Sequence, residues 1–314
     1  MKQYDLVIVG GGISGMTAAL VALKGGYSKV LIIERQKMLG GVLNQCIHNG
    51  FGKKLLEAEL TGPEYTNLIE KRIKEYPVEI RTDTEVIDIN EDKKVSYVNS
   101  KEGVVEVMAK AIVLATGCRE KFKGNINIPI NKYTGIYTVG SAQKIINSEG
   151  YLPGKEPIIV ARSKWAVIVA RRLIIEGAKV RVLIVQENDF FKFDDEVKEI
   201  LDGFEVPIIL NAEIIDIHGE ERIKGIKVRE GDRVSSIACD SLILSVGYFP
   251  ETDLLKGLDI NFNEKSLSPK LDNYMTESDG IFACGNLIYG LNALKEDEID
   301  GIDAGRAVLE YFNY

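Results

Sequence analysis

The spacing of apolar residues at the start of the chain predicts a strand, a helix and a second strand. Residues 4–9, YDLVIV, form a short run rich in β-branched side chains, and MTAALVALKGG from Met16 has the pattern of a buried helix. The run KVLIIE, which ends at Glu34, is again short and apolar. Together these segments make a βαβ unit of about 30 residues, the size expected of this motif.

Alternating apolar and polar residues follow the first βαβ unit. Thr61-Gly62-Pro63 introduces a helix predicted over residues 64–76, because proline is favoured in the first turn of a helix. The segments TEVIDI, KVSYV and VVEVMA alternate in the manner of an antiparallel meander. The next run, AIVLA, is apolar throughout, so we expect it to be a buried central strand.

The second half of the chain repeats this order of patterns. A second βαβ unit is predicted over residues 157–185, followed by a second meander and a second apolar strand. The final stretch, DGIFACGN and a helical run over about residues 292–311, has no counterpart in the second copy, so we assign it to the first module. The predicted fold class is α/β, with two Rossmann-like, three-layer nucleotide-binding domains that carry β-meander insertions. The first domain covers residues 1–118 and 241–314, and the second, residues 119–240, is inserted into it.

Composition narrows the classes of function. The chain has 314 residues, 45% of them hydrophobic, which is enough for two domain cores. The 39 Lys+Arg and 47 Asp+Glu residues give a net charge of −8, and no cluster of basic residues indicates a nucleic-acid or membrane-surface partner. The apolar residues 6–23 are interrupted by glycines, so we expect neither a transmembrane segment nor a targeting signal.

The four cysteines, Cys46, Cys118, Cys239 and Cys284, are far apart and contain no C-x-x-C pair. This spacing resembles neither a disulfide framework nor a metal site, so we predict no bound metal. It favours a reducing, cytoplasmic location.

The first βαβ unit carries the strongest motif of the sequence. Gly10-x-Gly12-x-x-Gly15 lies between the strand and the helix, and Glu34 closes the second strand. In the dinucleotide-binding fingerprint the first glycine permits a tight turn, the second lets the backbone approach a pyrophosphate, and the third lets helix and strand pack closely. The helix N-terminus attracts phosphates, and the carboxylate of Glu34 stands where it can accept hydrogen bonds from ribose hydroxyls.

These motifs carry a family resemblance over nearly the whole chain. The marks are VIVGGGISGMTAA with Glu34, VLATGCRE, SVGYFPETDLL and DGIFACGN. By them the chain resembles the pyridine nucleotide-disulfide oxidoreductase class of flavoproteins, which have two dinucleotide-binding domains. More narrowly, GGVLNQCIHNGFG, ELTGPEY, ATGCRE and LPGKE resemble a small FAD-containing subunit that accompanies glycerol-3-phosphate dehydrogenase-like flavoproteins.

The resemblance implies that the first domain binds FAD. Glu34 would hold the adenosine ribose, the backbone near Val86 would meet adenine, and Asn286 replaces the aspartate that usually bonds the ribitol chain. Asn286 can still donate and accept, so we expect this contact to be kept and weakened. The implied FAD-binding residues are Gly10, Gly12, Ile13, Ser14, Gly15, Glu34, Arg35, Gly41, Val42, Val86, Ala115, Thr116, Gly117, Gly285 and Asn286.

The equivalent turn of the second βαβ unit reads ARSKWA over residues 161–166 and keeps none of the three glycines. Ser163 adds side-chain atoms where a pyrophosphate should approach the backbone, and Gln186 stands in place of the ribose-binding carboxylate. We infer that this domain has lost ordinary NAD(P)H binding. The alternative is that Arg162 and Lys164 hold a phosphate with their side chains and admit an unusual nucleotide.

Cys46 and His48 are the candidate catalytic residues. Both lie in GGVLNQCIH, residues 40–48, where disulfide reductases of this class place a thiol against the flavin, but the segment has one cysteine and so provides no dithiol. Cys46 is either a reactive thiolate or a small buried side chain. His48 is either a proton donor and acceptor or a hydrogen-bonded structural residue. We assign no chemistry to His218.

The leading hypothesis is an FAD-dependent oxidoreductase that transfers electrons as one subunit of a multi-subunit dehydrogenase of the glycerol-3-phosphate or amino-acid dye-linked type. A partner dehydrogenase flavoprotein subunit would carry the substrate chemistry, and the chain would work in an oligomer or hetero-complex. One alternative is a stand-alone NAD(P)H- or thiol-dependent reductase that uses Cys46. Another, from a different class, is a non-catalytic scaffold subunit with structural FAD. The sequence does not identify the electron acceptor.

Overall fold

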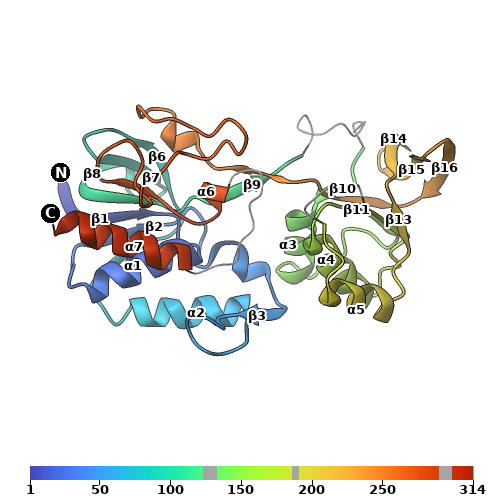
Figure 1. The fold of residues 1–314 in the computed structure, drawn as a ribbon, viewed down its shortest axis with the longest axis horizontal. Helices are drawn as coiled ribbons and strands as arrows, with labels where there is room; N and C mark the ends of the chain where they lie inside the picture. The colour runs from blue at the N-terminus through green and yellow to red at the C-terminus, as the bar shows by residue number, and fades with distance from the viewer. Residues whose placement is uncertain (123–132, 186–190, 290–298, 314) are drawn as a thin grey trace. The chain divides into compact units, whose positions relative to one another are not determined.

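The computed structural model describes residues 1–122, 133–185, 191–289 and 299–313. The chain divides into two compact units (Figure 1). Unit 1 contains Met1–Arg119 and Tyr248–Tyr314, and unit 2 contains Glu120–Gly247. In the part of the chain that is described, no helix is long and apolar enough to cross a membrane.

Unit 1 is built on a seven-stranded sheet. Its strand order is β5 (Val78–Arg81), β2 (Val30–Ile33), β1 (Lys2–Val9), β8 (Gly103–Leu114), β7 (Lys94–Asn99) and β6 (Thr84–Ile89), and β19 (Ile281–Ala283) also pairs with β8. Strands β1, β2, β5, β8 and β19 are parallel, whereas β6, β7 and β8 form an antiparallel meander. The predicted strands VVEVMA and AIVLA are one continuous strand, β8. Its first half pairs with β7 and its last three residues pair with β19.

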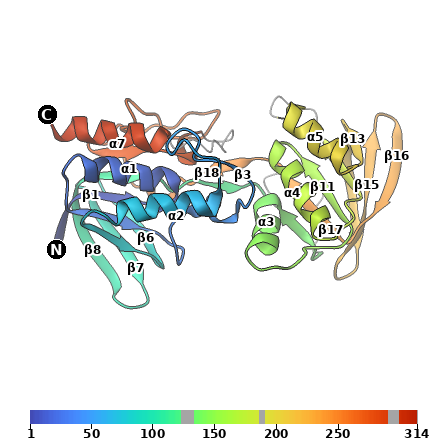
Figure 2. The same cartoon turned by 90° about the horizontal axis from the view of Figure 1, so that it is seen from below.

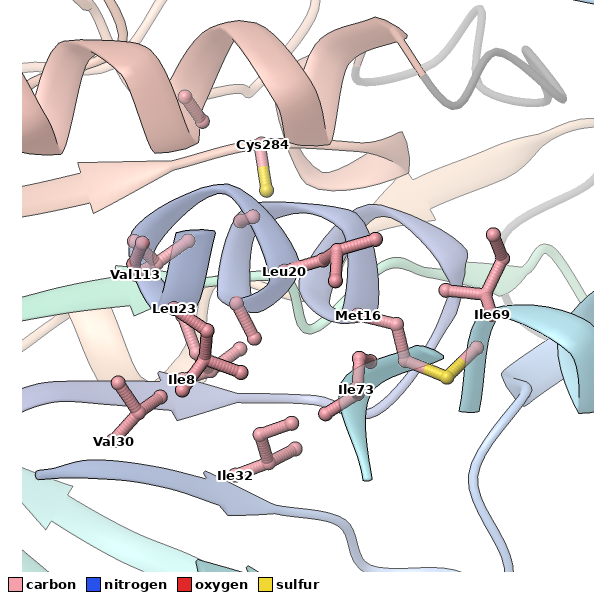
Figure 3. Close-up of a cluster of buried hydrophobic side chains, with 14 of the residues drawn as sticks. Ile8, Met16, Leu20, Leu23, Val30, Ile32, Ile69, Ile73, Val113 and Cys284 are labelled. Carbon is pink, nitrogen blue, oxygen red and sulfur yellow. The ribbon is translucent and has the colours of Figure 1, made fainter. Parts of the chain in front are cut away.

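Helices cover one face of this sheet, and the sequence pattern explains why. These helices are α1 (Ile13–Lys24), α2 (Gly62–Ile73) and α7 (Ile299–Phe312), and α1 and α7 lie side by side (Figure 2). Leu6 and Ile8 of β1 point into the core beneath them, which Figure 3 shows around α1. Val7 and Val9 point into a second core, on the opposite face of the sheet. Burial on both faces is what an uninterrupted apolar strand predicts.

Helix α2 begins and ends earlier than predicted. It starts at Gly62 because Thr61 and Glu64 form a capping box, in which the Glu64 carboxylate accepts the Thr61 N–H at 2.9 Å. The shorter elements of unit 1 are η1 (Gly41–Gln45), β3 (Asn49–Phe51), β4 (Leu60–Thr61), β18 (Tyr248–Pro250), η2 (Asp253–Leu255) and α6 (Asn286–Tyr289). Strand β9 (Cys118–Glu120) spans the point at which the chain leaves unit 1.

Unit 2 repeats the plan of unit 1. Its parallel sheet has the order β13 (Ile208–Leu210), β12 (Val182–Val185), β11 (Pro157–Ala161), β17 (Ser241–Ser245) and β10 (Ile136–Thr138), with helices α3 (Val139–Asn147), α4 (Lys164–Ile175) and α5 (Asp195–Gly203). The antiparallel meander is β14 (Glu213–Gly219), β15 (Ile223–Glu230) and β16 (Arg233–Ala238). The predicted fold class is therefore confirmed, with β10, α3 and α5 as elements that the sequence patterns did not reveal.

The return to unit 1 lies later in the chain than the expected position at residue 241. Strand β17 pairs with both β10 and β11, so it lies inside the sheet of unit 2. The chain consequently returns to unit 1 at Tyr248, and it leaves unit 1 after Arg119.

Candidate functional site

The glycine loop of unit 1 connects the carboxyl end of β1 to the start of α1. Gly10 has φ +104°, and a Cβ on it would lie 2.4 Å from the carbonyl oxygen of Ala115. A Cβ on Gly15 would lie 2.0 Å from the carbonyl oxygen of Gly10. These two glycines are thus required by the fold itself, through a left-handed turn and a close helix–strand contact.

Gly12 differs from these two glycines because it borders open space. Apart from Gly12 and its two chain neighbours, no atom of the described residues lies within 4 Å of the position of a Cβ on Gly12. Its backbone is extended, with φ −69° and ψ 178°, and it precedes the first turn of α1, where Ile13 and Ser14 are half-buried. This is the place where the fingerprint brings a pyrophosphate to the backbone, so the loop fits the dinucleotide FAD.

Glu34 follows β2 and is tied to the glycine loop. Its carboxylate oxygens accept the Gly11 N–H at 2.7 Å and the Gln36 N–H at 2.7 Å, and the residue is 6% exposed. A carboxylate oxygen can accept more than one hydrogen bond, so both oxygens keep acceptor capacity for ribose hydroxyls. The Thr84 N–H donates to the carbonyl oxygen of Glu34 at 3.1 Å, which brings the start of β6 beside it. Val86, on β6, is half-buried against the second core.

A second glycine pair, at residues 40–41, lies against the first loop. The Gly40 N–H donates to the carbonyl oxygen of Gly11 at 2.8 Å, and a Cβ on Gly41 would lie 3.1 Å from the Cα of Gly12. Both Gly40 and Gly41 have positive φ, at +116° and +58°. The following residue, Val42, is exposed. The structure therefore brings Gly41 and the glycine loop together, as the resemblance implies.

The loop after β8 and the loop after β19 lie at the same carboxyl edge of the unit 1 sheet as the glycine loop. Ala115, Thr116 and Gly117 are half-buried, and Gly117 has φ +77°. Beyond β19, a Cβ on Gly285 would lie 2.6 Å from the hydroxyl of Ser14. Asn286, the first residue of α6, is half-buried. Ala115 and Gly285 therefore lie beside the first turn of α1, where a Cβ on Gly15 would be 3.2 Å from the Cβ of Ala115.

The start of α7 lies at the same edge. A Cβ on Gly301 would lie 2.1 Å from the carbonyl oxygen of Ser14, so α7 packs closely on the first turn of α1. Asp300 is buried in the first turn of α7 and accepts hydrogen bonds from Tyr289 and, at 3.5 Å, from Tyr274. Burial, with the charge of Asp300 as a further cause, raises the pKa of Tyr274 to about 12. The helical run expected over about residues 292–311 corresponds to α7 from Ile299 onward, and its first part, residues 292–298, lies outside the described residues.

Glu251 belongs to this region, although sequence reasoning did not select it. Its N–H donates to the carbonyl oxygen of Gly117 at 3.0 Å, and its carbonyl oxygen accepts the Thr116 hydroxyl at 2.8 Å. Its carboxylate accepts two hydrogen bonds from the guanidinium of Arg119, which raises the pKa of Arg119. It also lies 3.9 Å from the guanidinium of Arg35. The only signal in the sequence was the motif SVGYFPETDLL, which marks the family without giving this residue a role.

The two catalytic candidates lie just beyond η1. Cys46 is 4% exposed, and its Sγ lies 3.5 Å from the carbonyl oxygen of Val42. Its own carbonyl oxygen accepts the Gly62 N–H at 2.8 Å, which joins the loop to the start of α2. The Nδ1 of His48 lies 3.0 Å from the carbonyl oxygen of Asn49. In this arrangement the Cys46 side chain packs in the core of unit 1.

The other three cysteines differ in burial. Cys118 is half-buried, whereas Cys239 and Cys284 are buried. Burial raises the pKa of the Cys239 thiol to about 12, and it raises that of Cys284 as well. Within the described ranges, no group of three His, Cys, Asp or Glu side chains is placed to hold a metal ion.

The altered loop of unit 2 is occupied by its own side chains. The hydroxyl of Ser163 lies 3.1 Å from that of Ser245, and Arg162 donates to the carbonyl oxygen of Val246 at 3.4 Å. Lys164 forms an ion pair with Glu196 at 3.7 Å. Ser163, which corresponds to Gly12, thus bonds a neighbouring strand instead of leaving open space. Gln186, the expected replacement for the ribose carboxylate, lies outside the described residues.

Comparison with known proteins agrees with this geometry. The family described as pyridine nucleotide-disulphide oxidoreductase matches residues 4–302. The F subunit of the alkyl hydroperoxide reductase of Staphylococcus aureus (strain Mu50 / ATCC 700699) is 25% identical over 322 residues, which cover 100% of this chain and 59% of that protein. The chain therefore spans well under two thirds of the length of this relative.

Two solved structures share the fold over almost the whole chain. The thioredoxin reductase of T. acidophilum has a TM-score of 0.80 at 20% identity and covers 100% of both chains. The bacillithiol disulfide reductase Bdr of Bacillus cereus has a TM-score of 0.78 at 17% identity, with 98% of this chain and 99% of that chain covered. None of these three proteins is a subunit accompanying a glycerol-3-phosphate dehydrogenase. The broad resemblance is thus confirmed, whereas the narrower one is not supported.

Proposed function

The chain belongs to the pyridine nucleotide-disulphide oxidoreductase family, and from that premise we propose that it is a stand-alone, FAD-dependent reductase of disulfides or related sulfur compounds. The reaction is a two-electron exchange in which a disulfide takes up two electrons and two protons and becomes two thiols. The electron donor is a reduced nicotinamide nucleotide or a second thiol compound. This proposal replaces the dehydrogenase subunit as the main interpretation, because the relatives are reductases by name.

The proposal rests on the geometry of the glycine loop and Glu34 in unit 1, where the cofactor would bind. Gly12 leaves open space at the start of α1, and the buried Glu34 closes the ribose end of the same edge. When bound there, FAD supplies the two-electron redox chemistry. The protein's contribution is to bind the pyrophosphate with the helix N-terminus and to hold the ribose with a carboxylate.

Cys46 is the thiol that we assign to this activity. It follows η1, the segment whose first residue, Gly41, contacts the glycine loop. Its burial in the core means that the thiol must turn outward before it can attack a disulfide. His48, two residues on, is the group that we assign to proton transfer, because histidine titrates near neutral pH.

An anaerobic assay tests the proposal. Purified protein with FAD is mixed with a dithiol, with NADH or with NADPH, and bleaching of the flavin absorbance is followed before a disulfide is added. We expect at least one donor to bleach the flavin and the disulfide to restore it. Cys46→Ser should abolish the restoration, whereas the matched variant Cys118→Ser should retain it. Failure of every donor to bleach the flavin would contradict the proposal, and an unaffected Cys46→Ser variant would remove Cys46 from it.

A second candidate, the electron-transferring subunit of a dehydrogenase complex, is favoured by the loop of unit 2. Ser163 bonds Ser245 where a nicotinamide nucleotide would need open space. A chain without a nicotinamide site would receive electrons from a partner flavoprotein. Protein that is inert to dithiols and to NAD(P)H, but is reduced by a flavoprotein that co-purifies from the native source, would support this second candidate. Rapid, reversible flavin reduction in either case would contradict a scaffold role.

A further inference from the structure

One acidic residue, Glu251, contacts the loop after β8, Arg119 and Arg35. Glu251 follows β18, and its side chain is 10% exposed. Through its backbone it bonds Thr116 and Gly117, and through its carboxylate it bonds Arg119 in a bidentate manner. The same carboxylate lies 3.9 Å from the guanidinium of Arg35. A residue far from Arg35 in the sequence thus places a negative charge beside it.

Arg35 occupies a position where orientation matters. It directly follows Glu34, the carboxylate of the ribose end, at the carboxyl edge of the sheet where ligands of this fold bind. The Arg35 side chain is 52% exposed, so packing alone does not hold it in place. A planar guanidinium binds either the face of an aromatic base or a phosphate, and both require it to be aimed.

Two features allow Glu251 to orient the guanidinium of Arg35. Its bidentate bond to Arg119 fixes the plane of the carboxylate, so Arg35 pairs with a charge that is already held in position. Removing the charge would leave two exposed guanidinium groups near one position with no carboxylate between them. Arg119 keeps its hydrogen bond to Asp253, so their repulsion would drive Arg35 outward.

We propose that Glu251 is a positioning residue for FAD, which holds Arg35 in place for the adenosine half of the cofactor. The inference rests on the proposed function only in requiring that unit 1 binds FAD. It assigns to Glu251 no contact with the reacting atoms.

The test uses apoprotein titrated with FAD and with the two halves of the cofactor, ADP and FMN. An ion pair of this kind contributes up to about 1 kcal/mol, so we expect Glu251→Gln to weaken FAD and ADP binding about fivefold. FMN lacks the adenosine half, so its affinity should change by less than about twofold. The matched control is Asp253→Asn, because Asp253 bonds Arg119 and Lys256. This control should bind FAD as the wild type does.

A double-mutant cycle separates positioning from a structural role. Arg35→Ala, at an exposed side chain that should not affect folding, must reproduce the loss of FAD and ADP affinity. Glu251→Gln combined with Arg35→Ala should bind no more weakly than either single variant. Additive losses, an equal loss of FMN affinity, or wild-type affinity in Arg35→Ala would each overturn the inference. If wild-type apoprotein binds no FAD at all, the proposed function itself fails.

Discussion

The two glycines Gly10 and Gly12 should respond in opposite ways to the same substitution. Alanine at Gly10 would adopt φ +104°, which costs about 1–3 kcal/mol. Its Cβ would also lie 2.4 Å from a backbone oxygen, and relieving that contact costs about 1–3 kcal/mol more. We therefore expect Gly10→Ala to lower the free energy of unfolding of the apoprotein by about 2 kcal/mol or more.

Alanine at Gly12 meets no such obstacle. The backbone at φ −69° is one that alanine adopts, and the new Cβ enters open space. The free energy of unfolding should stay unchanged or rise by up to about 1 kcal/mol, because the unfolded chain loses freedom. The Cβ would, however, occupy the space through which the pyrophosphate reaches the N–H groups of α1. Losing one charge-assisted hydrogen bond costs about 1.5–3 kcal/mol, so FAD affinity should fall by about tenfold or more.

Urea denaturation of the apoprotein and fluorescence titration with FAD measure the two effects separately. Gly203→Ala is the matched control, in α5 of unit 2. Apart from its chain neighbours and the backbone of its own helix, its Cβ also meets no atom of the described residues within 4 Å. This control should leave FAD affinity unchanged, and its free energy of unfolding should stay unchanged or rise by up to about 1 kcal/mol, as for Gly12→Ala. Wild-type FAD affinity in Gly12→Ala would refute the assignment of the pyrophosphate site. Destabilisation of Gly12→Ala as large as that of Gly10→Ala would refute the distinction between the two glycines.

Three further predictions concern other parts of the chain. Iodoacetamide should label Cys118 in the native protein before the three buried cysteines, as judged by mass spectrometry. Rapid labelling of Cys284 would contradict its burial and its raised pKa. Burial raises the pKa of the Glu120 carboxyl, so the native state binds the carboxyl proton more tightly than the unfolded chain does. The free energy of unfolding therefore falls as the pH rises through and above the ordinary pKa of a glutamate. Glu120→Gln should consequently increase the free energy of unfolding at pH 7. At about pH 3, where Glu120 is protonated in both the native and the unfolded state, the substitution should leave it nearly unchanged. An equal change at both pH values in urea denaturation would contradict this. Ser163→Gly removes the bond to Ser245 and should increase the rate of anaerobic flavin reduction by NADH in stopped-flow measurements, whereas an unchanged rate would mean that this side chain does not limit nucleotide binding.

The sequence predicted those parts of the fold in which a local pattern carries the information. The βαβ unit around Gly10 was found because a strand, a glycine loop and a helix follow one another within about 30 residues. Strand β8 was divided in two, because its first half alternates beside β7 whereas its last residues are buried on both faces. The return to unit 1 was placed too early because Ser241–Ser245 resembles the last strand of either domain until its partners, β10 and β11, are known.

The same limit applies to the site. Residues that follow parallel strands meet at one edge of a sheet, so the motif residues from Gly10 to Gly285 could be assembled from the sequence. Glu251 could not, because its contact with Arg35 depends on how distant loops fold together. The sequence also leaves open whether Cys46 is a reactive thiolate or a small buried side chain, because its burial depends on η1 packing against α2.

We propose that unit 1 binds one redox-active FAD, which takes up all the electrons that the protein accepts. An anaerobic reductive titration, with electrons counted per chain against the flavin absorbance, tests it most directly. We expect uptake of about two electron equivalents per chain, all of them accounted for by bleaching of one flavin. Uptake of about four, or a flavin that takes up none, would contradict it.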